Sequence, residues 1–427
     1  MAGSTRVFRG LALALSCLWA AAAAGQRGGA FTESRDHDAI LYSSRETTDP
    51  VAQLNRRIQD GQAKLAFDGP RGYLRAVLDE LGVPVESQML VFSETSFQFE
   101  QISYTTPRAL YFNDTTWVGW VHEGDALEVA AQDPQQGVVF YELAQRTDTP
   151  PRFTRNRRCM ECHLSPTNTI GVPGVFSMSM LPLSDNPNEY AQGWMVDHRT
   201  PIEERWGGWF VTGAKAPMKH LGNVPVLHVP RSYVREPRAP VLKTVEKIDS
   251  RLYLTPYSDV VALMLFNHQT QFMNLVTRLG WEARIAAHAA ASGKPAAGIT
   301  PGMRDTIDDL VDYMLFIDEA PIAGDIQGSS GFAEKFSARG PADSKGRSFR
   351  QLDLETRLLR YPCSYMIYTP AFDALPPAVK TAVYERMWRI LSGQDPDKAY
   401  TRLTPGDRQA IIEILRATKK DLPASFK

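Results

Sequence analysis

The chain has 427 residues, of which 43% are apolar and 22% charged, a composition typical of a globular protein with substantial cores. It excludes a disordered chain and a protein with many membrane spans, and the length allows one large domain or two to three ordinary ones. The formal net charge is −1 and the basic residues are scattered, so nothing indicates nucleic acid as a partner.

The first 24 residues have the pattern of a secretory signal peptide. Arg6 and Arg9 precede an apolar run, Leu11 to Ala24, that ends in small residues. We expect cleavage after Ala24, a periplasmic or secreted protein, and no membrane span after cleavage; an uncleaved anchor is the alternative. Without residues 1–24 the chain has 45 basic and 48 acidic side chains, a formal charge of −3.

Residues 25–148 form the predicted N-terminal α+β part. Apolar residues at helical spacing predict helices within 49–67 and 70–83. From residue 89 to 143, short apolar and aromatic runs predict four to five strands in a small antiparallel sheet or partial barrel. The expected turns are at 113–114, 123–125 and 133–134.

Two further parts complete the expected α+β fold. Residues 149–230 are rich in Pro, Gly and Trp and predict loops with short helices. Residues 231–427 predict a mainly helical half, with a long helix that begins at Ser258 as N-cap and ends at Gly293. Further helical patterns cover 300–320, 376–393 and 404–420. Residues 25–427 form either separate parts or one continuous domain.

The stretch with the clearest chemistry is Cys159-Met160-Glu161-Cys162-His163. Two thiols one helical turn apart can add to the two vinyl groups of a haem, and the histidine that follows can bind the iron from the same side. The motif therefore predicts one covalently attached haem c, with His163 as axial ligand. Attachment takes place outside the cytoplasm, which agrees with the predicted signal peptide.

The same motif also occurs in thioredoxin-like redox sites, zinc sites and disulfides. A thioredoxin-like pair needs a strand-to-helix junction in a βαβ unit, which the loop-rich flanks do not predict. A zinc site needs a fourth ligand at short spacing, whereas His198 is 35 residues beyond His163. A disulfide between Cys159 and Cys162 would leave the histidine incidental. Cys363 lies among aromatic residues and is interpreted as a buried, unreactive thiol.

The sixth iron position has several candidate ligands. The stretch 212–225 contains both Met218 and His220, at a distance from the motif that is usual for a distal ligand. We predict His220, with Met218 and His198 as alternatives; an open position is a further alternative. Met178 and Met180 lie too close to the motif in sequence for the usual arrangement.

Two other groups of residues near the motif have structural interpretations besides a role at the haem. Trp206 and Trp209 flank two glycines and are interpreted as core anchors rather than as walls of a haem site. Four arginines could neutralise haem propionates or guide an acidic partner, but a solvated basic surface is the simpler interpretation. These arginines are Arg152, Arg155, Arg157 and Arg158.

The chain resembles a group of secreted, single-haem, cytochrome c-like bacterial proteins without an assigned reaction. The resemblance runs through the stretches 107–121, 159–163, 203–213 and 360–376. It implies that Cys159 and Cys162 are thioether sites, that His163 is an axial ligand and that the protein is exported. The flanking sequence does not resemble the compact all-helical cytochrome c fold, so the distal methionine of that fold is not carried over.

The function expected from these residues is electron transfer through one haem c, by outer-sphere exchange with a redox partner protein or a small redox substrate. The alternative is a haem enzyme, a peroxidase or other oxidoreductase, because pure electron carriers are usually small. A haem-based sensor, or a subunit of a larger respiratory assembly, is a third expectation.

Overall fold

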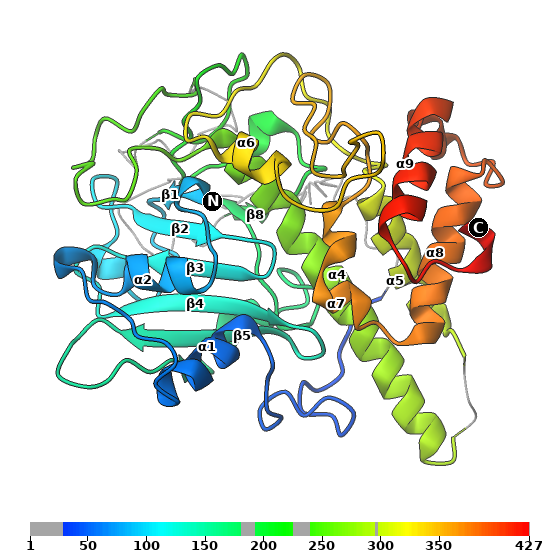
Figure 1. The fold of residues 1–427 in the computed structure, drawn as a ribbon, viewed down its shortest axis with the longest axis horizontal. Coiled ribbons are helices and arrows are strands. Elements are labelled where there is room, and N and C mark those ends of the chain that lie inside the picture. Colours follow the sequence, from blue (N-terminus) through cyan, green and yellow to red (C-terminus); the bar gives the residue numbers. More distant parts are fainter. Residues whose placement is uncertain (1–28, 181–192, 225–239, 295–297, 427) are drawn as a thin grey trace, which may run out of the picture.

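A computed structural model describes residues 29–180, 193–224, 240–294 and 298–426. The predicted signal peptide, residues 1–24, lies outside these ranges. The architecture is α+β, as predicted: an antiparallel sheet belongs to the N-terminal half and most of the helices to the C-terminal half. Figure 1 shows the sheet and the C-terminal helices on opposite sides of the long helix α4, Val260–Ala291.

The larger sheet has six strands that pair in chain order within the described residues (Figure 1). The strands are β1 Met89–Val91, β2 Arg108–Phe112, β3 Thr116–Trp120, β4 Ala126–Asp133, β5 Gly137–Ala144 and β6 Thr154–Arg155. The first five confirm the predicted strands. The sixth was missed, because a two-residue strand has no alternation to detect.

The turns of this sheet lie where the turn residues predicted them. Between β2 and β3, Asn113 Oδ1 accepts hydrogen bonds from two backbone N–H groups, and Asp133 Oδ1 does the same between β4 and β5. Glu123 has a φ of 58° in the turn between β3 and β4. Side-chain oxygens that bond to backbone two or three residues on stabilise such turns locally.

Two N-terminal helices accompany the sheet, α1 Pro50–Gln59 and α2 Leu74–Glu80, within the two predicted ranges. Asp49 caps α1 by accepting hydrogen bonds from two N–H groups of its first turn, and Val51 and Leu54 are buried. Tyr141 of β5 donates to the same Asp49 carboxylate at 2.7 Å. One buried aspartate thus joins the start of α1 to the sheet.

Helix α4 is buried along most of its length and contacts both halves of the molecule. Its N-cap is Asp259, one residue beyond the predicted Ser258. Asp259 Oδ1 accepts from two N–H groups of the first turn. Ser258 Oγ instead donates to the carbonyl of Phe210 and accepts from the N–H of Leu90. The predicted end is confirmed, since Gly293 follows the C-cap with a φ of 84°.

The other helices of this half pack around α4. They are α5 Pro301–Met314, α6 Phe332–Ser337, α7 Pro370–Asp373, α8 Pro377–Leu391 and α9 Pro405–Thr418. Thr300 and Thr404, each followed by Pro-Gly, cap α5 and α9. The buried apolar side chains form one cluster that extends from Phe31 to Phe426. Cys363 lies in it with no exposed surface, which confirms its predicted burial.

Within the four described ranges, no helix has both the length and the apolar character that a bilayer span requires.

Candidate haem site

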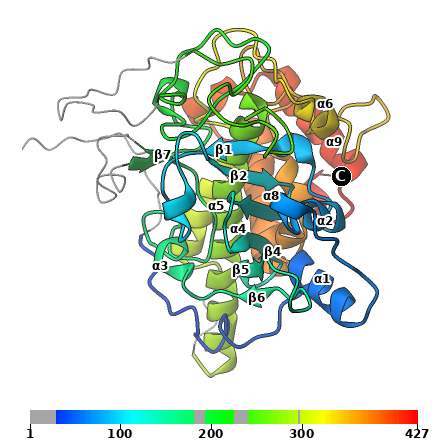
Figure 2. The ribbon, with the colours of Figure 1, turned by 90° about the vertical axis from the view of Figure 1, so that its left-hand side faces the viewer.

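The motif lies on a single helical turn, α3 Met160–His163, with Cys159 as its N-cap. The turn follows β6, and Figure 2 shows α3 beside strands β5 and β6. Met160 is buried and anchors the turn, whereas Cys159 is half-buried and Cys162 is exposed. Because positions three apart on a helix share a face, both thiols are on the same side of the turn.

The ring of His163 is held by the backbone of a loop eleven residues further on. Its Nδ1 lies 2.8 Å from the carbonyl oxygen of Gly174, and the N–H of Gly174 donates to the carbonyl of His163 at 3.0 Å. A carbonyl oxygen only accepts, so Nδ1 must carry the proton. The lone pair of the neutral ring is therefore on Nε2, which is the arrangement of metal-binding histidines.

Two aromatic rings flank this imidazole. Phe140 of β5 and Phe176 each have their ring centroid 4.7 Å from that of His163. Burial lowers the pKa of His163 to about 4, so its ring is neutral at physiological pH. The residue is thus positioned, oriented and uncharged, as an iron ligand must be.

Gly174, Phe140 and Phe176 were not among the predicted site residues. Gly174 acts through its backbone carbonyl, and such a contact has no side-chain signature. Phe140 comes from a strand that ends 15 residues before Cys159. Only the aromatic character of the surrounding stretches was a signal for these residues, and it did not distinguish them from core residues.

The two thiols do not have the properties of the alternative sites. Within the described residues neither Cys159 nor Cys162 forms a disulfide. Burial raises the pKa of Cys159 to about 12, with a further contribution from Glu128 and Glu142. A thioredoxin-like nucleophile needs the opposite shift, and the motif follows an antiparallel strand rather than a strand of a βαβ unit.

A zinc site finds no support either. Among the described residues, no three His, Cys, Asp or Glu side chains are grouped so that they could hold a metal ion. A structural zinc site requires four such ligands. The donor set at α3, two thiols and one imidazole on one turn, fits covalent haem attachment better than it fits a protein-only metal site.

His220, the predicted distal ligand, is fully buried against the ring of Trp206. Its Nδ1 accepts a hydrogen bond from the N–H of Gly222 at 3.0 Å, so in the neutral ring Nε2 carries the proton. Burial lowers its pKa to about 3. In this conformation Nε2 carries a proton and offers no lone pair to an iron. The ligand role of His220 stays a prediction, and it requires a change of tautomer.

The two alternative ligands have different surroundings. His198 is buried, and its Nδ1 lies 2.8 Å from Nδ1 of His268, whose Nε2 is 2.7 Å from Ser364 Oγ. His268 belongs to α4, and both rings pack in the core against Tyr313 of α5. Met218 is half-buried and packs against the core. None of the ring contacts or hydrogen bonds that the described residues make with His163 involves these side chains.

Met178, which lies too close to the motif in sequence for the usual distal ligand, begins a short hairpin two residues after Phe176. The hairpin pairs β7 Met178–Met180 with β8 Gly193–Met195. Ser177 and Ser179 both point toward the core, to Asn267 and to the backbone of Gly207. Since side chains alternate along a strand, the half-buried Met178 lies on the face of β7 opposite to Ser179.

The two tryptophans next to this hairpin are core anchors, as interpreted from the sequence. Trp206 and Trp209 are 1% and 5% exposed. The indole N–H of Trp206 donates to Asn267, and that of Trp209 donates to the carbonyl of Met178. Gly208 between them has a φ of 84°, a conformation that favours glycine.

Three of the four predicted arginines make contacts within the fold. Arg155 donates to backbone carbonyls of the segment 42–45 before α1, and Arg157 donates to a carbonyl of the same segment at 3.4 Å. The guanidinium of Arg158 lies 4.3 Å from the ring centre of Phe97, which is 40% exposed. The cluster is therefore partly structural, and Arg158 with Phe97 forms a mixed basic and apolar surface beside Cys159.

Comparison with known proteins leaves the site to be interpreted from its own geometry: no protein-family model, no curated protein and no solved structure matches this chain.

Proposed function

We propose that this protein is a c-type cytochrome that carries one covalently attached haem. The thiols of Cys159 and Cys162 would hold the haem through two thioether bonds, and Nε2 of His163 would bind its iron. The observation that carries the proposal is the 2.8 Å hydrogen bond from Nδ1 of His163 to the carbonyl of Gly174. It sets the tautomer that a metal-binding imidazole needs, next to two thiols on the same turn.

The activity we propose is electron transfer in the periplasm. When bound, the haem supplies iron that cycles between the ferrous and ferric states. His163 would hold this group, and the rings of Phe140 and Phe176 pack against the imidazole. The redox partner is a protein or a small redox molecule that reaches the exposed side of α3, where Cys162 lies.

Attachment is tested by producing the full chain in cells that export and mature c-type cytochromes, followed by haem staining of a denaturing gel. The wild-type band should stain, and Cys159→Ala with Cys162→Ala should abolish the stain. Cys363→Ala is the matched control and should retain it, because that thiol is buried in the core. An unstained wild-type band, or a stained double variant, would contradict the proposal.

The second candidate function is a haem enzyme or sensor with an open sixth iron position. The tautomer of His220 favours it, because Nε2 of the predicted distal ligand carries a proton. Optical and spin-resonance spectra of the purified protein separate the two functions. A low-spin, six-coordinate haem that does not react with carbon monoxide or cyanide supports the electron carrier. A high-spin, five-coordinate haem rules the carrier out and supports the enzyme or sensor.

A further inference from the structure

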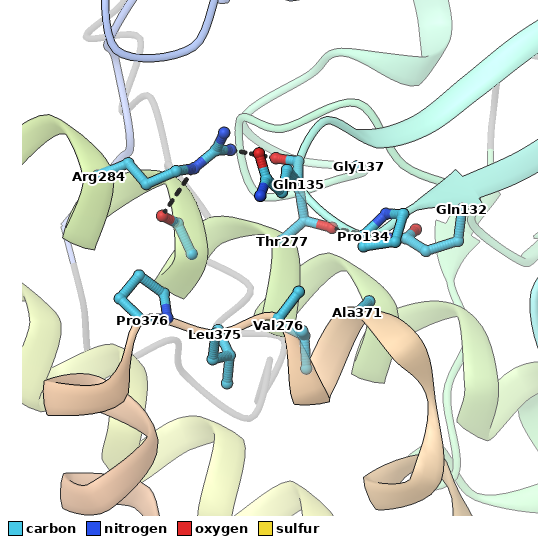
Figure 3. A pocket seen from close by; sticks show the side chains of 12 residues that line it. Gln132, Pro134, Gln135, Gly137, Val276, Thr277, Arg284, Ala371, Leu375 and Pro376 are labelled. Atoms are coloured by element: carbon cyan, nitrogen blue, oxygen red, sulfur yellow. Dashed lines mark hydrogen bonds between the residues drawn. The ribbon is translucent and has the colours of Figure 1, made fainter. Parts of the chain in front are cut away.

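The hairpin of β4 and β5 has a different polar environment at each of its two ends. At the turn it lines a pocket of about 120 Å³, where Figure 3 shows Arg284 of α4 reaching toward Gln135. Two nitrogens of this guanidinium donate to the carbonyls of Gln135 and Gly280, and the third, Nη1, is buried, so the pocket offers a ligand no free cation. Toward the other end of the hairpin lie two carboxylates, Glu128 of β4 and Glu142 of β5.

These two carboxylates share the face of the sheet against which His163 lies. Side chains two residues apart are on the same face of a strand, so Glu142 is on the face of Phe140, whose ring centroid is 4.7 Å from that of His163. Glu128 is directly opposite Glu142 on the neighbouring strand. Directly opposed residues of an antiparallel pair also share a face, which places Glu128 there as well.

A short chain of hydrogen bonds connects Glu142 to the turn that bears the thiols. Oε1 of Glu142 accepts from the side-chain amide of Asn156. Oδ1 of Asn156 accepts from the N–H of Arg158, the residue before Cys159, at 2.9 Å. The N–H of Asn156 donates to the carbonyl of Phe140, also at 2.9 Å. Asn156 therefore fixes both the carboxylate and the start of α3 to the same strand.

One cation balances only one of the two carboxylates. Arg108 of β2 forms an ion pair with Glu128, and the two side chains are 18% and 17% exposed. Glu142 is half-buried and, in the part of the chain that the structure describes, its carboxylate bonds to the neutral Asn156 and forms no ion pair. Since like charges directly opposite each other destabilise a sheet, Arg108 offsets part of this cost and leaves one negative charge in excess.

The same charges act on both the thiol and the imidazole of the motif. Burial is the main cause of the raised pKa of Cys159, and the charges of Glu128 and Glu142 raise it further. Burial likewise lowers the pKa of His163, and on this ring the charges of Arg108 and Glu128 act in opposite directions. An iron bound to Nε2 of His163 would be within reach of these side chains, because charges that are partly buried are screened less than exposed ones.

Ferric iron has one more positive charge than ferrous iron, so a nearby negative charge stabilises the oxidised state and lowers the reduction potential. We propose that Glu142, beside the ion pair of Arg108 and Glu128, sets the reduction potential of the haem iron by holding a fixed negative charge on this face of the sheet. The inference rests on the proposed attachment of haem at α3. A partner that delivers one electron to the ferric protein then has to be a stronger reductant than one that would suffice without this carboxylate.

The test is a spectroelectrochemical titration of the purified, haem-loaded full chain. Glu142→Gln keeps an acceptor oxygen but removes the charge, so we expect the ferrous-to-ferric ratio at a fixed applied potential to rise about tenfold, which corresponds to about 59 mV for one electron. Arg108→Gln, which leaves Glu128 without its cation, should shift the ratio in the opposite direction. Glu86→Gln removes a half-buried carboxylate that pairs with Lys335, and as the matched control it should leave the potential unchanged.

Two further readouts separate a fixed charge from a structural role. The Soret maximum and the haem stain of Glu142→Gln should match those of the wild type, because the charge acts without a change of iron ligand. Arg108→Gln combined with Glu128→Gln should shift the potential less than Arg108→Gln alone, since the two lost charges have opposite signs. These variants leave Glu142 unchanged, so a folding defect in Glu142→Gln does not decide the outcome.

The possible failures are distinguishable. A wild-type chain without haem would overturn the proposed function and this inference with it. Bound haem whose potential is the same in the wild type, Glu142→Gln and Arg108→Gln would overturn only the inference. Shifts of equal sign in the two variants, or an altered Soret maximum in Glu142→Gln, would also overturn it, because they would show that these side chains act by positioning α3.

Discussion

Glu319 is a carboxyl group in the core, only 4% exposed, just beyond α5. Its Oε1 accepts a hydrogen bond from the N–H of Leu358 at 2.7 Å, and its Oε2 lies 3.5 Å from Arg402. Burial raises the pKa of Glu319 to about 7, and the attraction of Arg402 and Arg205 only partly offsets it. The charged form is therefore disfavoured in the native protein, although cations are near.

This raised pKa predicts how stability changes with pH. The native carboxyl keeps its proton to about pH 7, whereas the unfolded carboxyl loses it near its ordinary pKa of 4.5. The stabilising contribution is complete below pH 4.5 and is lost as the pH rises through 7. Glu319→Gln keeps the acceptor oxygen but cannot titrate. We therefore expect the unfolding free energy of the wild type to fall relative to this variant by about 3 kcal/mol between pH 4.5 and 7.5.

Urea unfolding of both proteins at several pH values checks this difference. Other titrating groups contribute equally to the two proteins, so they cancel in the comparison. Parallel profiles for the wild type and Glu319→Gln would contradict the raised pKa.

Helix α4 depends on one carboxylate at its start. Oδ1 of Asp259 caps the first turn, and Oδ2 accepts from the N–H groups of Ser329 and Ser330 and from the hydroxyl of Ser330. The same side chain thus caps the N-terminus of α4 and binds a loop that lies 70 residues further along the chain. Without Asp259, the N–H groups of the loop and of the helix N-terminus would lose this acceptor.

Asp259→Ala should destabilise the protein much more than the loss of an ordinary cap. Loss of a cap costs about 1 kcal/mol, and each buried N–H group left without a partner costs about 1–3 kcal/mol more, so we expect about 3–5 kcal/mol in total. Thr300→Ala, which removes the single cap bond of α5, is the control and should cost about 1 kcal/mol. Equal unfolding free energies for the two variants would show that the loop does not depend on Asp259.

At the scale of the whole molecule, the sheet and the helices share one core. The ring of Phe112 in β2 packs 5.6 Å from that of Phe266 in α4, and Gln132 of β4 donates to Thr277 of α4 at 3.0 Å. Ser258, just before α4, bonds to the backbone of Leu90 in β1. The face of the sheet that contacts α4 would expose apolar side chains if the helix were removed.

A chain that ends at residue 240 should therefore fail to fold. It retains all eight described strands but lacks α4 and the helices that pack on it. We expect a weak near-ultraviolet circular dichroism signal and no cooperative urea transition, because the exposed core of the sheet has no cover. A cooperative transition of this fragment would instead show that the N-terminal half is an independent domain.

Much of the fold could be predicted from local patterns. Short apolar and aromatic runs, broken by turn residues such as Asn113 and Asp133, predicted the strands, and helical patterns predicted α5 and α9. The cap of α4 was placed one residue too early, because Ser258 and Asp259 are both good N-caps. Only the contacts of Ser258 with β1 and with Phe210 decide between them.

The sequence by itself determined the motif residues Cys159, Cys162 and His163 and the order of the elements, because covalent spacing and hydrophobic period are local properties. Tertiary structure decided the tautomer of His163 and the rings that contact it. These depend on Gly174 and Phe140, whose roles come from a backbone carbonyl and a ring brought close by folding. A backbone carbonyl is the same in every residue, so its role becomes visible only when the chain has folded.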